Sequence, residues 1–195
     1  MTAVCYVSPV VPSSERRAHR FTRAEYHRMG EAGVFPPGVR LELIDGEVLE
    51  VSPQRPPHAL AVHLCLEALR TAFSTGHWVR CQLPLACEPD GEPEPDVSVV
   101  PGEARHYLAD HPRAALLVVE VADSTLRTDR LDKAALYARM AIPEYWILNL
   151  ADRILEVHRA PTGDRYAVVE RLDAQARITP LGLPGSAIAV GTLLP

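Results

Sequence analysis

Apolar side chains recur along the chain with two different periods, and these periods predict helices and strands. In HALAVHLCLEALRTAF, the residues Val62, Leu66 and Phe73 recur at helical spacing, so a long helix is expected there. A second helix is expected in RTDRLDKAALYARM. A shorter one begins after a capping residue, Thr22, and ends near Gly30.

The other patterned segments predict strands. RLELIDGEVLEVSP is typical of a hairpin, because its two alternating runs meet at Asp45-Gly46, a strong turn signal. HWVRCQLPLAC alternates, PDVSVV and PEYWILNL are apolar runs, and AALLVVEVA is apolar on both faces, which favours a central strand. RILEVHR and RYAVVERL indicate a last hairpin with its turn at 161–163. This order predicts an α/β fold with a mixed sheet, because it lacks the regular βαβ alternation of a doubly wound fold.

Length and composition indicate one domain over residues 1–195, with residues 1 to about 15 as a flexible extension. The hydrophobic content of 47% and the charged content of 23% are ordinary for a folded protein. No apolar run is long enough to span a membrane, and the N-terminus lacks the features of a secretory signal. Because no pair of cysteines has metal-ligand spacing, we expect reduced thiols and a cytoplasmic location. The cysteines are Cys5, Cys65, Cys81 and Cys87.

Charge and motifs narrow the function classes. A net charge of -5 argues against indiscriminate coating of nucleic acid, although it is compatible with a local basic cleft. No Gly-rich phosphate loop follows a strand, so nucleotide binding has no support. The arginine-rich stretch that holds Arg16, Arg17, Arg20 and Arg23 could contact a nucleic-acid backbone, but a solvated N-terminal face is the favoured interpretation.

Two acids and one lysine are the strongest candidates for chemistry. Asp96 opens the strand in EPEPDVSVV, and Glu120 interrupts the most apolar run, where a carboxylate is costly unless it is paired or holds a cation. If the two strands are neighbours, both acids can converge on a hard divalent cation, which prefers oxygen ligands. The chain has nineteen arginines but a single lysine, Lys133, on the helix that follows. Such a set suits hydrolysis of a phosphodiester, because the metal activates a water and the amine stabilises developing charge.

Each of these residues also has a structural interpretation. Asp96 could be a turn aspartate after Pro95, Glu120 could pair with an arginine, and Lys133 could lie on a helix surface by chance. Taken together, the three favour a functional site. Other polar residues have structural interpretations as the favoured ones. Glu92 and Glu94 are interpreted as solvated loop charges or outer residues of the site, and Asp129 and Asp132 as acids that favour the helix dipole. His58 could touch a substrate phosphate or a water, but a residue of a helix cap is the favoured interpretation. Core or dimer-contact aromatics, rather than base-stacking ones, are expected at Tyr137, Tyr145 and Trp146.

Three segments resemble successive signatures of the Uma-two family, restriction endonuclease-like proteins of the PD-(D/E)XK nuclease superfamily. They are LELIDGEVLEVSPQRPPHA, EPEPDVSVV and LLVVEVADSTLRTDRLDKAALYARMAIPEYWILNL. The resemblance implies a restriction endonuclease-like mixed sheet flanked by helices, with an added N-terminal helix and hairpin. It also implies an endonuclease that hydrolyses DNA with Mg²⁺ or Mn²⁺. By this resemblance Asp96 and Glu120 are metal ligands, and Glu42 is a further acid of the metal site.

One position departs from the superfamily pattern. The motif lysine should follow Glu120 by two residues, where this chain has Ala122, so Lys133 would have to supply the amine from the next helix. Two other functions stay open: a non-catalytic nucleic-acid-binding or assembly module that retains the nuclease fold, and hydrolysis of a different phosphate ester. A homodimer is also expected, because two related sites are the simplest way to cut two strands.

Overall fold

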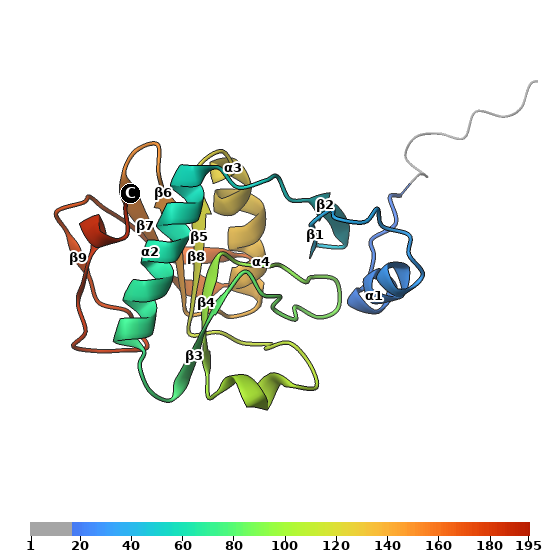
Figure 1. Cartoon of the computed structure of the whole chain (residues 1–195), viewed down its shortest axis with the longest axis horizontal. Helices are drawn as coiled ribbons and strands as arrows, with labels where there is room; N and C mark the ends of the chain where they lie inside the picture. Colours follow the sequence, from blue (N-terminus) through green and yellow to red (C-terminus); the bar gives the residue numbers. More distant parts are fainter. Residues whose placement is uncertain (1–16) are drawn as a thin grey trace, which may run out of the picture.

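The computed structural model describes residues 17–195 and has a six-stranded mixed sheet at its centre (Figure 1). The predictions for residues 1–15, Cys5 and Arg16 lie outside the described residues. The strands follow the order β3-β4-β5-β6-β7-β8, in which only the pair β5–β6 is parallel. Their bounds are β3 (His77–Cys81), β4 (Val97–Pro101), β5 (Leu117–Ala122), β6 (Glu144–Asn149), β7 (Ile154–Thr162) and β8 (Arg165–Leu172).

Helices cover both faces of the sheet. On one face lies α2 (Pro56–Ala72), which forms one core cluster with the sheet through Val62, Leu69 and Val97. On the other face, Tyr137 of the later helical segment packs with Val118 in a second cluster. That segment is divided into α3 (Leu126–Thr128), a π-helical turn η3 (Asp129–Lys133) and α4 (Ala134–Arg139). Smaller elements are η2 (Ala104–Tyr107), β9 (Arg177–Ile178), β10 (Ile188–Ala189) and η4 (Val190–Thr192).

Two sequence predictions of strand extent need correction. The strand predicted for HWVRCQLPLAC ends at Cys81, because Gln82 has a φ of 50° and the following residues form a loop. The last hairpin turns later than the predicted 161–163, since β7 continues to Thr162, which pairs with Arg165. The other elements form where the apolar pattern predicts them, and β5 is central and buried on both faces. No described helix is long and apolar enough to cross a membrane.

An N-terminal helix and a hairpin lie to one side of the main sheet (Figure 1). Helix α1 (Arg23–Glu31) is capped at its N-terminus by Thr22, which forms a capping box with Glu25. Strands β1 (Leu41–Ile44) and β2 (Glu47–Glu50) form an antiparallel two-stranded sheet. Asp45 and Gly46 both have positive φ, as the two-residue turn requires.

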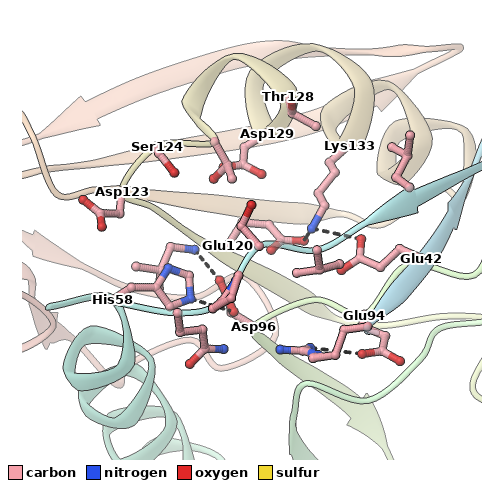
Figure 2. Close-up of a pocket in the computed structure, with 18 of the residues that line it drawn as sticks. Glu42, His58, Glu94, Asp96, Glu120, Asp123, Ser124, Thr128, Asp129 and Lys133 are labelled. Atoms are coloured by element: carbon pink, nitrogen blue, oxygen red, sulfur yellow. Dashed lines mark hydrogen bonds and ion pairs between the residues drawn. The ribbon is translucent and has the colours of Figure 1, made fainter. Parts of the chain in front are cut away.

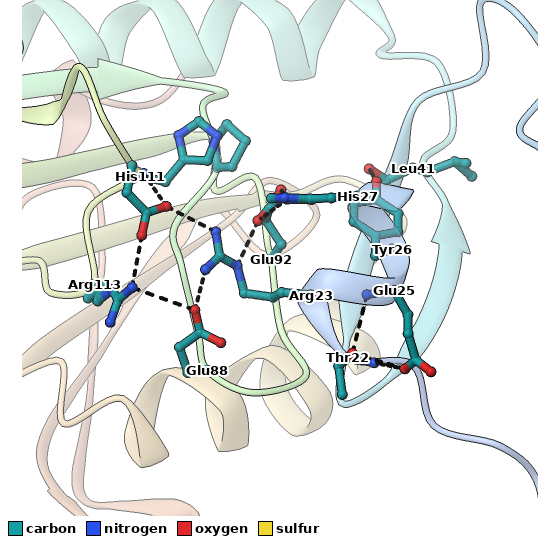
Figure 3. A network of polar contacts seen from close by, with 12 residues as sticks. Thr22, Arg23, Glu25, Tyr26, His27, Leu41, Glu88, Glu92, His111 and Arg113 are labelled. Carbon is teal, nitrogen blue, oxygen red and sulfur yellow. Dashed lines mark hydrogen bonds and ion pairs between the residues drawn. The ribbon is translucent and has the colours of Figure 1, made fainter. Parts of the chain in front are cut away.

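The N-terminal helix and hairpin contact the loop at 88–92, which leads to the main sheet. The buried side chain of Arg23, in α1, lies at the centre of this contact (Figure 3). The Nε of Arg23 donates to Glu92 Oε2 at 2.7 Å, and its guanidinium also pairs with Glu88 and Asp110. The expected solvated positions of Arg23 and Glu92 are therefore wrong. Both side chains are buried because each neutralises the other, which is the condition under which charges tolerate burial.

Candidate metal and phosphate site

Four side chains singled out in the sequence come together at one end of the sheet (Figure 2). Asp96 directly precedes β4, and Glu120 lies in the neighbouring strand β5, where Val97 pairs with Val119. Lys133 reaches the same place from the π-helical turn, and Glu42 reaches it from β1 of the hairpin. Four separate elements therefore supply the site.

The only lysine lies between two buried carboxylates. The Nζ of Lys133 is 3.0 Å from Glu120 Oε1 and 3.3 Å from Glu42 Oε2. The hydroxyl of Tyr137 donates to the same Glu120 oxygen at 2.7 Å. Ala122 is buried at the end of β5, so the amine contacting Glu120 comes from the helix. Glu42 is buried and faces into the site, so it is not an exposed charge on the edge of the hairpin.

Asp96 is held by three donors. Its Oδ2 accepts from the backbone N–H of Val121 at 2.9 Å, and its Oδ1 lies 3.2 Å from both His58 Nε2 and Gln82 Nε2. Burial raises the pKa of Asp96, but the hydrogen bond and charge of His58 outweigh it, so the net pKa is lowered. Asp96 is therefore an oriented carboxylate in its ionised form.

Sequence reasoning missed two residues of the site. Asp129 was interpreted as a helix-dipole acid, yet its carboxylate is buried, lines the same pocket and accepts from Thr125 Oγ1 at 2.6 Å. His58 was interpreted as a cap residue, and it does lie in the first turn of α2, but its ring contacts Asp96. The spacing along the sequence could have indicated Asp129. It precedes Lys133 by four residues, and a helix places residues at that spacing on one face.

The site is a pocket of about 490 Å³ between the β1–β2 hairpin and the sheet. The sheet side carries Asp96 and Glu120, and the hairpin side carries Glu42 together with the apolar side chains of Ile44 and Leu49. At the mouth, Arg40 pairs with Glu94 at 3.1 Å and Arg55 pairs with Asp123 at 2.7 Å. Glu94 is thus a rim residue of this pocket, as one of its two sequence interpretations held.

Carboxyl groups outnumber basic groups at the bottom of the pocket. Burial raises the pKa of Glu120 well above its usual range; the charge of Lys133 lowers it, and nearby Asp96 raises it further. Burial also raises the pKa of Glu42 and of Asp129. For Lys133, burial lowers the pKa, but the charges of Glu120 and Glu42 outweigh burial and the net pKa is raised. The site therefore has more carboxyl groups than one ammonium can pair with, and a bound cation would favour their ionised forms.

The donor set fits a hard divalent cation in its chemistry. Carboxylate oxygens are the ligands that Mg²⁺ and Mn²⁺ prefer, and a dication would offset the excess of buried negative charge. Among residues 17–195, however, no three His, Cys, Asp or Glu side chains are already arranged to hold one metal ion. Lys133 instead occupies one oxygen of each of Glu42 and Glu120.

The comparisons with known proteins agree with this architecture. A family model described as "putative restriction endonuclease" (Uma2) matches residues 23–191. The fold is similar to the crystal structure of "a putative nuclease belonging to DUF820" from Anabaena variabilis, with a TM-score of 0.70 and 15% identity over 89% of this chain and 97% of that chain. No curated protein matches the chain. The predicted fold class, a mixed sheet flanked by helices, is thereby confirmed.

Proposed function

The chain belongs to the Uma2 family of restriction endonuclease-like proteins, and we propose that it is a metal-dependent endonuclease that hydrolyses phosphodiester bonds in DNA. One observation supports this most strongly. The single lysine of the chain lies, largely shielded from solvent, between buried carboxylates from two different sheets, beside a third carboxylate that precedes a neighbouring strand. Burying so many acids around one amine is costly unless the site also binds a cation, and a bound cation would in turn attract an anionic phosphate.

In the proposed reaction, Asp96, Glu120 and Glu42 would hold Mg²⁺ or Mn²⁺. When bound, the metal neutralises the phosphate and lowers the pKa of a water at the site. Asp96 keeps its orientation through the N–H of Val121 and the side chain of His58. Lys133 presents an ammonium group at Nζ, which would orient the attacking water or stabilise the charge that develops on the phosphate.

A cleavage assay tests this proposal. With millimolar Mg²⁺ or Mn²⁺, we expect the wild type to cut end-labelled DNA and Asp96→Asn and Lys133→Met to lower the rate by at least about 100-fold, the scale of losing one electrostatic stabiliser. Asp132→Asn is the matched control, because Asp132 is exposed on the same helical turn as Lys133. If Asp96→Asn and Lys133→Met cut at the wild-type rate, the site assignment is wrong.

A second function rests on a specific observation. Because Lys133 pairs with both Glu42 and Glu120, the arrangement also suits a non-catalytic nucleic-acid-binding or assembly module that retains the fold. Such a module would show no metal-dependent cleavage in the assay above. The cytoplasmic location and the homodimer expected from the sequence stay predictions.

A further inference from the structure

The groups of the candidate site lie deep in the pocket rather than on an open face. Asp96 is 8% exposed, Glu120 3% and Asp129 2%. A pocket of about 490 Å³ has the size of a site for a small organic ligand, not for a double helix. Duplex DNA is stiff over the length of such a site, whereas a single strand can bend to bring one phosphate into the pocket. Depth and size therefore favour a single strand at this site.

The two walls of the pocket match the two parts of a nucleotide. Glu42 and Leu49 are directly paired in the β1–β2 hairpin and so point to the same face, together with Ile44. Leu49 is 37% exposed and lines the pocket on the hairpin side, beside Glu42 and across from the sheet that carries Glu120. An apolar wall suits a sugar or base, while the other wall holds the groups proposed for the phosphate. Among the described lining residues none is Phe, Tyr or Trp, so stacking on an aromatic ring is not part of this fit.

Two arginines stand on opposite sides of the pocket mouth. Figure 2 shows Asp123 and Glu94 on either side of the Asp96–Glu120–Lys133 group. Arg55 pairs with Asp123, and Arg40 pairs with Glu94. Both arginine side chains are exposed to solvent. Exposed ion pairs contribute little to stability, so both arginines can exchange a carboxylate for a phosphate at small cost. Both arginines line the pocket, so each is available to a phosphate of a strand that enters it.

We propose that the site takes single-stranded nucleic acid, whose backbone is held at the mouth by Arg40 and Arg55 while a sugar or base packs on Leu49. The inference rests on the proposed function for its choice of a nucleic-acid ligand. It predicts binding with strong salt dependence and little base preference, because charge rather than base-edge contact supplies the affinity.

Fluorescence anisotropy tests the strand preference with a labelled DNA oligonucleotide and the duplex of the same sequence. The solution contains Ca²⁺, a hard cation with the same preference for oxygen ligands, to measure binding apart from the Mg²⁺ reaction. We expect the wild type to bind the single strand at least tenfold more tightly than the duplex. Equal or tighter binding of the duplex, or no binding of either, would overturn the inference.

Matched variants test the assigned contacts. Arg40→Gln and Arg55→Gln should each weaken single-strand binding by about threefold to tenfold and reduce the slope of log K against log salt by about 0.7, the value for one phosphate contact. Arg70→Gln, on the exposed side of α2, is the control and should change neither quantity. Leu49→Ser should weaken binding, whereas Leu108→Ser, at a fully exposed leucine, should not. If Arg40→Gln and Arg55→Gln bind like the control, the proposed contacts of Arg40 and Arg55 with the nucleic-acid backbone are wrong.

Binding and cleavage distinguish this inference from the proposed function. A protein that binds the single strand preferentially but cuts no DNA would contradict the endonuclease proposal and support the strand preference. A protein that cuts duplex DNA faster than the single strand would support the endonuclease proposal and overturn the strand preference.

Discussion

Asp129 is a buried carboxylate of the site with few partners to stabilise its negative charge. Its one described side-chain hydrogen bond comes from Thr125 Oγ1, and burial raises its pKa. An asparagine would remove a buried negative charge and keep an oxygen acceptor for Thr125. Residues retained against stability in this way are typical of functional sites, where activity and stability trade off.

We therefore predict that Asp129→Asn stabilises the metal-free protein. The free energy of unfolding should rise by about 0.5–2 kcal/mol, the usual range for relieving such a site. Urea unfolding in EDTA measures it, with Asp132→Asn as an exposed control expected to stay within about 0.5 kcal/mol of the wild type. A lower unfolding midpoint for Asp129→Asn would show that its charge stabilises the fold.

At the residue scale, the sequence revealed those side chains that break a local pattern. Glu120 interrupts an apolar strand and Lys133 is the single lysine, so both are conspicuous without a structure. Asp129 and His58 fit their local surroundings, as an acid early in a helix and a residue of a first turn, and their second role arises only from three-dimensional contacts. The sequence could not separate them from ordinary structural residues.

At the scale of elements, the loop at 88–92 connects the N-terminal unit to the sheet. Backbone hydrogen bonds join Arg23 to Pro89, Gly46 to Asp90 and Leu43 to Glu92. The side chain of Arg23 neutralises Glu92 within this contact. Since Glu42 belongs to the same hairpin, the position of one site carboxylate depends on this loop.

Replacing Arg23 should loosen the hairpin. Arg23→Ala leaves Glu92 buried without its main partner, which we expect to cost about 3–5 kcal/mol, as for other broken buried pairs. Amide hydrogen exchange should become faster at Leu43 and Gly46, while the exposed control Arg28→Ala should leave both rates unchanged. Unchanged exchange in Arg23→Ala would mean that backbone contacts alone hold the hairpin.

Local signals predicted the elements better than their arrangement. The Asp45-Gly46 turn, the Thr22 cap and the periodicity of α2 are encoded within short stretches, and each element forms where expected. The π-helical turn that carries Lys133 has no such signal, because an ordinary helix fits the same apolar pattern. The hairpin's position over the end of the sheet depends on long-range contacts that periodicity does not report.

At the scale of the whole molecule, one end of the sheet collects the acids while the mouth of the pocket carries the arginines. A net charge of -5 does not prevent binding of an anionic strand, because the field near Arg40, Arg55 and Lys133 is local. If the substrate is a single strand, one site is sufficient for one cut. The homodimer expected from the sequence would then not be required for cleavage.

Calorimetric titration of Mn²⁺ and Mg²⁺ tests the central claim most directly, that the buried acids form a metal site. The wild type should bind the metal, and Glu120→Gln, which retains the shape of the side chain but removes its charge, should lose this binding. A labelled single strand with a non-cleavable backbone is added in a second series, so that phosphate can complete the metal's ligands. Absence of binding in both series, or equal binding by Glu120→Gln, would contradict the account.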